Sequence, residues 1–239
     1  MPPPNAPSRP NRFYAAAEGG AVEAGWGVLL DGRAVRTPAG ARLVAPTQVL
    51  ASLIAEEWAA QGETIELAGM AATRLAFSAV DRIALKRAET AAEVARFAGA
   101  DLLCYFAEAP QALTERQTKR WGPVLEWAGE ALGLTFHRTV GIIHRAQPPE
   151  TVERVAALAL ALDDFALAAL AMAAGLFGSA LLALALQRNQ LSGEAAFELS
   201  RLDEEFQEQI WGVDAVAEAR RSLLTADAVL LDRWFQALR

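Results

Sequence analysis

The acidic residues near position 205 come closest, by type and spacing, to a reactive site in this chain. Asp203, Glu204 and Glu205 are consecutive, and Glu208 follows three residues later. Carboxyl groups in such an arrangement could supply a general acid and a general base, or ligands for Mg²⁺. Successive positions of a helix point in different directions, however, and a run of acidic residues is usually a solvated face. A soluble enzyme with a carboxylate-based site and an unknown substrate is therefore kept as the alternative hypothesis.

The other reactive residue types do not form a catalytic set. His137 and His144 lie in a segment expected to be extended, where they would face opposite sides of a strand and could not bind one metal ion together. Cys104 has no histidine beside it and lies in an apolar run, which favours a buried thiol. The glycine-rich nucleotide-binding motifs and the G-x-S-x-G motif are absent from the sequence. We expect no catalytic residues, no metal site and no cofactor.

The segment Ser200–Gly212 predicts a helix with an apolar face and a polar face. The apolar residues recur at the i, i+3, i+4 spacing of a stripe that packs on a core, and they are Leu199, Leu202, Phe206 and Ile210. The opposite face is polar except for one aromatic side chain, and its members are Glu204, Gln207, Glu208 and Trp211. Gly212 stands where a residue in the left-handed conformation would end the helix.

Trp211 on the polar face has two interpretations. An indole surrounded by polar groups is typical of the anchor of a protein–protein interface. Alternatively, the helix frays at Gly212, the indole packs back onto the domain, and the carboxylates are merely solvated. On the first interpretation, Glu204, Gln207, Glu208 and Trp211 form a site that binds a protein partner.

The bulk composition excludes several classes of protein. With 239 residues, 53% of them hydrophobic and 21% charged, the chain is globular and long enough for one large domain or two small ones. A net charge of −7 disfavours binding to nucleic acid or anionic lipid. The single cysteine cannot form an internal disulfide, and the proline-rich N-terminus has no apolar core that could act as a signal sequence. Secretion is not expected.

Residues 165–186 carry no charged side chain and raise the question of a membrane span. As one helix they would be about 33 Å long, which is enough to cross a bilayer. Gly175, Gly178 and Ser179 interrupt the segment, and no cluster of basic residues marks a cytoplasmic side. We therefore favour two buried, antiparallel core helices over insertion into a membrane.

The chain divides by pattern into three parts, which predict an α+β fold. Residues 1–12 are read as an extended, proline-rich arm; residues 13–85 as a small β-rich N-terminal domain with one helix; and residues 86–239 as a larger, mostly α-helical domain. In the first domain, Asp31-Gly32 predicts the turn of a hairpin. A third strand is expected at Arg42–Val44, and a helix at Gln48–Ala60 with Thr47 as its N-cap.

Helical patterns dominate from about residue 81 onward, with one strand among them. Thr135–Ile143 is rich in β-branched residues and predicts a lone strand that either pairs with the first domain or crosses between helices. The expected helices are Asp81–Ala98, Pro110–Trp121, Val124–Leu132 after an interruption at Gly122-Pro123, then 149–174, Leu176–Gln190, the acidic helix, and one from about Asp214 to Leu238.

Five blocks of this sequence, in this order, are similar to one known family. They are Val28–Pro38, Glu56–Gly62, Thr73–Ala76 with Asp81-Arg82, Asp101–Tyr105 and Ser200–Gly212. Together they resemble the assembly chaperone of the F-type ATP synthase alpha subunit, a family shared by mitochondria and alphaproteobacteria. The resemblance spans about residues 13–215.

This resemblance implies a non-catalytic role, in which the protein holds the free alpha subunit soluble until the beta subunit replaces the chaperone. It also implies a monomer in the bacterial cytoplasm, or in the mitochondrial matrix for eukaryotic members. The family's acidic helix maps onto Glu204, Gln207, Trp211 and Gly212, of which the first three are interface candidates. Its helix-end tryptophan maps onto Trp58, which looks like a core residue. Phe77 stands where the family commonly has asparagine, and residues 165–186 are more apolar than expected.

Overall fold

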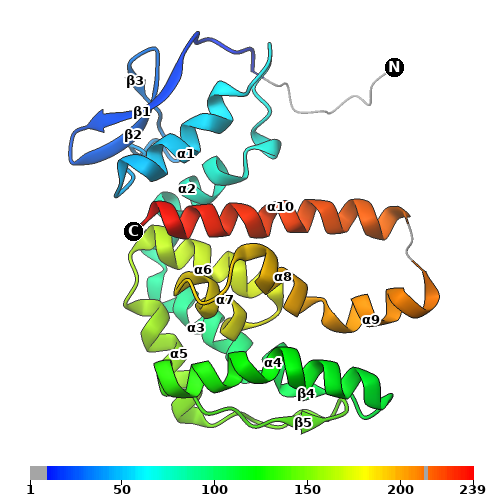
Figure 1. Cartoon of the computed structure of the whole chain (residues 1–239). Helices are drawn as coiled ribbons and strands as arrows, with labels where there is room; N and C mark the ends of the chain where they lie inside the picture. The colour runs from blue at the N-terminus through cyan, green and yellow to red at the C-terminus, as the bar shows by residue number, and fades with distance from the viewer. Residues whose placement is uncertain (1–9, 213–214) are drawn as a thin grey trace. The chain divides into compact units, whose positions relative to one another are not determined.

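The computed structural model describes residues 10–212 and 215–239, with only the backbone described at 215 and 216. These residues form two compact units, the first comprising residues up to Arg82 together with Gln236–Arg239, and the second comprising Ile83–Phe235. A small sheet lies in the first unit and most of the helices lie in the second, so the predicted α+β class is confirmed (Figure 1). No pattern in the sequence indicates that the last four residues belong to the first unit.

The sheet of the first unit is an antiparallel meander. Its strands are β1 (Ala17–Val22), β2 (Gly25–Leu30) and β3 (Arg33–Ala34), in that order. Asp31 and Gly32 have φ angles of 48° and 79°, so the predicted hairpin turn is confirmed. Instead of a third strand at Arg42–Val44 there is only an isolated bridge between Arg36 and Arg42. β1 was not predicted, because its sequence of small residues contains only one β-branched side chain.

Two helices pack in the first unit, where the sequence predicted one. α1 (Gln48–Ala59) begins as expected, with the Thr47 hydroxyl accepting a hydrogen bond from the backbone N–H of Leu50 at 3.1 Å. The second, α2 (Ala71–Asp81), follows the short 3₁₀ helix η1 (Leu67–Gly69). Glu57 of α1 accepts hydrogen bonds from the backbone N–H groups of Ala72 and Thr73, both at 2.8 Å. This cap comes from another helix, so no local signal marked the start of α2.

The predicted N-terminal arm is wrong for its last three residues, while residues 1–9 lie outside the described part of the chain. The carbonyl oxygen of Pro10 accepts a hydrogen bond from the N–H of Ile65 at 2.8 Å, and the N–H of Arg12 donates to Glu63 at 2.8 Å. The Arg12 guanidinium also binds the carbonyl oxygens of Tyr14 and Ala15. Residues 10–12 are therefore part of the first unit.

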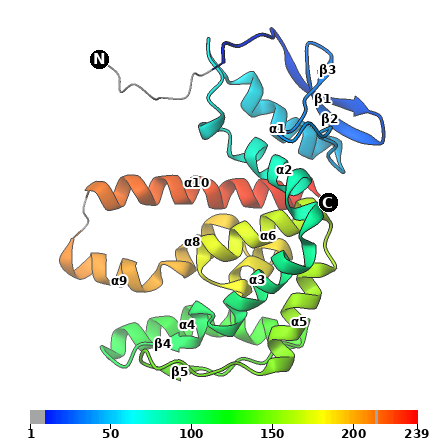
Figure 2. The same ribbon diagram turned by 180° about the vertical axis from the view of Figure 1, so that it is seen from behind.

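The second unit is built mainly of helices (Figures 1 and 2). Its elements in chain order are η2 (Ile83–Leu85), α3 (Arg87–Gly99), η3 (Leu102–Cys104), β4 (Tyr105–Phe106), α4 (Gln111–Leu132), β5 (Thr139–Val140), α5 (Pro149–Leu160), α6 (Asp164–Phe177), α7 (Ala180–Gln187), α8 (Gly193–Ser200), α9 (Leu202–Trp211) and α10 (Ala215–Ala237). The predicted helix over 149–174 is two helices, because Asp163 caps α6 by accepting from the N–H groups of Phe165 and Ala166.

The uncharged segment forms two core helices, α6 and α7, as predicted. Gly178 adopts a left-handed conformation (φ 62°) that ends α6, and the Ser179 hydroxyl caps α7 by accepting from the N–H of Leu182 at 3.0 Å. α6 packs on α3 and α7, and Ala180–Leu186 are all buried. Among the described residues, no helix is both long enough and apolar enough to cross a membrane.

Two other predictions for the second unit are wrong. α4 runs without interruption through Pro123, because its neighbours Trp121, Val124 and Leu125 are all buried and their packing offsets the hydrogen bond that proline cannot make. The predicted strand over Thr135–Ile143 shrinks to the two residues of β5, which pair in parallel with β4 of the same unit. Neither the shortness of β5 nor its parallel pairing with β4 could be inferred from the local sequence.

Asp101 is fully buried, and its side chain connects the start of η3 with the start of α7 through hydrogen bonds. Its carboxylate accepts hydrogen bonds from the Ser179 hydroxyl at 2.7 Å, from the N–H of Leu181 at 3.0 Å and from the N–H of Leu103 at 3.2 Å. Burial raises the pKa of Asp101 from 3.8 to about 6, although these hydrogen bonds act to lower it. The carboxyl group therefore titrates in the folded protein at a higher pH than in the unfolded chain.

We predict a pH-dependent stability difference between the wild type and Asp101→Asn. The raised pKa means that the folded state binds the proton more tightly, so this stability is complete below about pH 3.8 and is lost as the pH rises through about 6. The free energy of unfolding of the wild type, minus that of Asp101→Asn, should fall by about 2 kcal/mol between about pH 4 and pH 7. Urea unfolding across this range measures it. A difference that grows with pH would show that the hydrogen bonds outweigh burial.

Gly193, the first residue of α8, allows α8 and α10 to approach closely. A Cβ atom at this position would lie 2.1 Å from the carbonyl oxygen of Ala228. We predict that Gly193→Ala lowers the free energy of unfolding by about 2 kcal/mol or more, since backbone must move to make room. The control is Gly129→Ala on the exposed side of α4, which should be neutral or stabilising by up to about 1 kcal/mol. Equal effects of the two substitutions in urea unfolding would contradict the close approach.

Candidate partner-binding site

The acidic segment is divided between two helices, and its predicted apolar stripe is only partly buried. α8 ends at Ser200 and α9 begins at Leu202, with a turn at Arg201 between them. Leu199 and Leu202 are buried as predicted, but Phe206 is only half-buried and Ile210 is 58% exposed. The prediction that all four residues face the core is therefore wrong for Ile210, because the core covers only the start of α9, where Leu202 is the one buried residue of this helix.

Side chains of α4 hold α9 at three positions along its length. The Gln117 side-chain amide donates a hydrogen bond to Asp203 at 2.7 Å, and Arg116 donates to Gln209 at 2.9 Å. The Arg116 guanidinium also lies 5.1 Å from the centre of the Phe206 ring, within the range of a cation–π contact. Burial raises the pKa of Asp203, while the hydrogen bond from Gln117 lowers it. These contacts fix which side of α9 faces α4.

Glu208 connects α9 to α10 and does not lie on the exposed face. Its carboxylate oxygens accept hydrogen bonds from Arg201 at 2.9 Å and from Arg221 at 3.2 Å, and its side chain is only 19% exposed. The prediction that Glu208 lies on an exposed face together with Trp211 is therefore wrong, because Glu208 points toward α10. The sequence could not show this, because the partner Arg221 lies on another helix.

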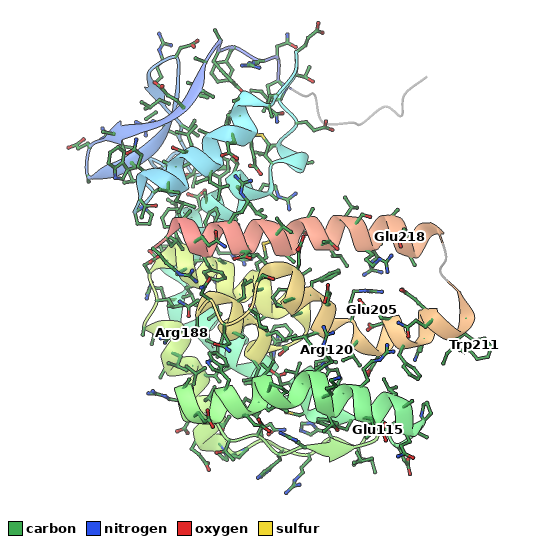
Figure 3. All side chains as sticks on the ribbon, in the orientation of Figure 1. Glu115, Arg120, Arg188, Glu205, Trp211 and Glu218 are labelled. Carbon is green, nitrogen blue, oxygen red and sulfur yellow. The ribbon has the colours of Figure 1, made fainter. Side chains whose placement is uncertain are left out.

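The remaining predicted site residues are exposed. Glu204 and Gln207 face solvent, and Trp211 is 85% exposed at the end of α9, directed away from the neighbouring helices (Figure 3). Among the described residues the indole does not pack back onto the domain, so that part of the alternative interpretation is wrong. Gly212 has a positive φ of 87°, as expected at the end of a helix, but its ψ of 168° is not that of a left-handed cap.

A groove of about 680 Å³ lies beside α9 in the second unit. Its charged wall combines Glu204 with three arginines, Arg201, Arg220 and Arg221. Its apolar part is contributed by three other helices and consists of Leu176, Phe177, Phe197 and Leu224. Sequence reasoning did not find these residues, because they come from α6, α8 and α10 and meet only in the folded unit. The groove places apolar surface and charge next to the exposed Glu204.

The carboxylates do not form the pocket that a carboxylate-based enzyme would need. Burial raises the pKa values of Asp203 and Glu205, but Asp203 is bound to Gln117, whereas Glu205 lines a separate groove against Arg116 and Arg120 of α4. Asp101 has no exposed surface that a substrate could reach. No described groove therefore contains two of these perturbed acids.

The histidines and the cysteine are engaged elsewhere in the second unit. His144 Nδ1 lies 2.8 Å from the Tyr105 hydroxyl, and His137 Nδ1 lies 3.3 Å from the carbonyl oxygen of Ala146. Burial raises the pKa of the Cys104 thiol, which disfavours the reactive thiolate. Within the described ranges, no group of three or more histidine, cysteine or acidic side chains is placed to hold a metal ion.

Comparison with known proteins gives consistent matches. The family model described as ATP12 chaperone protein matches residues 11–129. The protein atp12, mitochondrial, of Schizosaccharomyces pombe is 27% identical over an alignment of 197 positions that covers 77% of this chain and 68% of that protein.

Two solved structures extend the likeness over nearly the whole chain. The crystal structure of Atp12 from Paracoccus denitrificans is 39% identical, with a TM-score of 0.90 over 96% of this chain and 99% of that one. The Atu1473 protein of Agrobacterium tumefaciens is 40% identical, with a TM-score of 0.91 over 96% of this chain and 87% of that one. Identity of 39% over nearly the whole of both chains shows more than a shared fold, and the chain belongs to the ATP12 chaperone family.

Proposed function

We propose that this protein binds the free alpha subunit of the F-type ATP synthase catalytic head and keeps it soluble until the beta subunit takes its place. Membership in a chaperone family over nearly the whole chain supports this role. A protein that must cover a client surface needs an exposed anchor on a firmly held element. The exposed Trp211 on the anchored helix α9 is the observation that best fits this need.

The physical case rests on the contrast between the contacts that hold α9 and the side chains that its last turn exposes. The helix is fixed by α4 through Arg116 and Gln117 and by α10 through Arg221. Its last two residues, Ile210 and Trp211, are nevertheless largely in water, although burying such side chains would stabilise the protein by about 1.5–3 kcal/mol each. Exposed aromatic anchors on pre-organised elements dominate protein–protein interfaces. We infer that Trp211 anchors the client.

Glu204 and Gln207 act in this proposal as the polar rim around the anchor. Both are exposed on α9, and Glu204 also lines the groove beside it. Glu208 takes a different role from the one predicted, because its contacts with Arg201 and Arg221 hold α9 against α10. Glu208 therefore positions the interface without touching the client.

We further propose that the protein acts by holding its client rather than by catalysis. A holding chaperone protects only the client molecules that it has bound. The fraction of alpha subunit kept soluble should therefore rise with the molar ratio of chaperone to client. The protein should act as a monomer without cofactor, in the cytoplasm of a bacterium or in the matrix of a mitochondrion. No observation in the described residues favours the enzyme alternative over this role.

The direct test is light scattering by the isolated alpha subunit during dilution from denaturant. We expect suppression that saturates near one chaperone per client, with no hydrolysis of ATP by the chaperone alone. Suppression by catalytic amounts, or turnover of nucleotide, would contradict a holding mechanism. Bovine serum albumin at the same concentration controls for nonspecific protection.

We predict that Trp211→Ala and Glu204→Lys each weaken binding to the alpha subunit by about 2 kcal/mol, or about thirtyfold. Both side chains are exposed, so the melting temperature should be nearly unchanged. Titration calorimetry and thermal melts measure the two effects. The matched control is Phe13→Ala, which removes an exposed aromatic side chain from the first unit and should leave affinity unchanged. Equal losses for Phe13→Ala and Trp211→Ala would mean that α9 has no special role.

Glu208→Gln should behave differently from Glu204→Gln. Loss of the Glu208 charge weakens the hold on Arg201 and removes one of the two carboxylates that bind Arg221, which keeps its ion pair with Glu218, so we expect stability to fall by about 1 kcal/mol. Amide hydrogen exchange in α9 should become faster as the helix loosens. Glu204→Gln, at an exposed position, should change neither quantity. Unchanged exchange in Glu208→Gln would show that α9 is held by its contacts with α4 alone.

A further inference from the structure

A second exposed apolar surface lies in the second unit, in the segment that contains β5 and the loop after it. Ile142 is 97% exposed, Ile143 is 79% exposed, and Val140 at the end of β5 is 63% exposed. We call residues 137–147 the Ile142 loop. Figures 1 and 2 show β5 beside β4 along α4. Loops usually present polar residues to water, and adjacent exposed apolar side chains mark interaction sites.

The base of the Ile142 loop is fixed by specific hydrogen bonds. The buried side chain of Gln147 accepts from the backbone N–H of His137 at 2.7 Å and donates to the carbonyl oxygen of His137 at 3.0 Å. The N–H of Gly141 donates to the carbonyl oxygen of Phe106 at 2.8 Å. The two isoleucines are therefore presented by a pre-formed loop, which lowers the entropy that binding must overcome.

The charge of the loop is opposite to that of the whole chain. Residues 137–145 contain two arginines and two histidines and no acidic residue, whereas the chain carries a net charge of −7. Arg138 lies with its guanidinium 5.7 Å from the centre of the Phe106 ring, and Arg145 is exposed. A partner surface that fits this loop therefore combines apolar side chains with carboxylates.

β5 also has an unpaired edge. β4 and β5 form a two-stranded sheet, so in the described part of the chain β5 has a strand partner on one side only. An edge of this kind can accept an extended segment of another protein through backbone hydrogen bonds. The open edge, the exposed isoleucines and the arginines lie on one short segment, Arg138–Arg145.

We propose that the Ile142 loop is a second docking surface for the alpha subunit, and that it takes an extended segment of that client carrying apolar and acidic side chains. The segment pairs with the free edge of β5, its apolar side chains contact Ile142 and Ile143, and its carboxylates face Arg138 and Arg145. This inference rests on the proposed client but uses a surface separate from α9.

The test is calorimetric titration of the isolated alpha subunit into the full-length chain. The double variant Ile142→Asp with Ile143→Asp places negative charge on the loop, so binding should weaken tenfold or more. Arg145→Glu should weaken binding as well and should reduce its dependence on salt. The matched control is Leu85→Asp, since Leu85 is 82% exposed in the same unit and should not affect affinity.

The outcomes separate this inference from the proposed function. If the wild type does not bind the alpha subunit, the proposed function fails. If the wild type binds and the double variant binds within twofold of it, only the second docking surface is overturned. A melting temperature that falls in the double variant and in Arg145→Glu would show a structural role and would also overturn the inference. The inference would also be overturned if the substitutions changed only the self-association of the protein on size-exclusion chromatography, or only its binding to anionic vesicles.

Discussion

The buried side chain of Asp101 supports the core of the helical unit, because it accepts hydrogen bonds from polar groups at the break in the most apolar part of the chain. A turn between two all-apolar helices leaves N–H groups without partners, and burying such groups is costly. Asp101 and Ser179 accept these hydrogen bonds at the start of α7. With the break satisfied, α6 and α7 can be surrounded by other helices. α3 and α8 each contact both core helices.

The position of α9 follows from electrostatic contacts more than from apolar burial. Only Leu202 of this helix is buried, yet α9 is held on one side by Arg116 and Gln117 and on the other by Arg221 through Glu208. A helix fixed mainly by polar contacts can leave its apolar residues in water. This arrangement accounts for the exposed Ile210 and Trp211, which a helix that packed by burying its apolar stripe would hide.

Sequence reasoning succeeded where the signal is local. The Asp31-Gly32 turn, the Thr47 cap and the two helices interrupted at Gly178-Ser179 each depend on a few adjacent residues with strong conformational preferences. It failed where the partner is distant in sequence. The cap that Glu57 provides for α2, the contact between Glu208 and Arg221, and the parallel pairing of β5 with β4 are all of this kind. For the same reason Trp211 could be singled out from its neighbours, whereas the groove beside it could not.

The two proposed docking surfaces on the second unit would fit the requirements of a chaperone that must also release its client. A single tight interface would dissociate slowly, because affinity differences between related complexes are mostly differences in off-rate. Two weaker contacts on one unit gain affinity through effective concentration, without either being strong. A competing subunit can then displace them one at a time, since loss of the first contact removes the advantage of the second. An anchor such as Trp211 and a loop such as the one at Ile142 would divide the binding energy in this way, so the client could be held firmly and still be transferred.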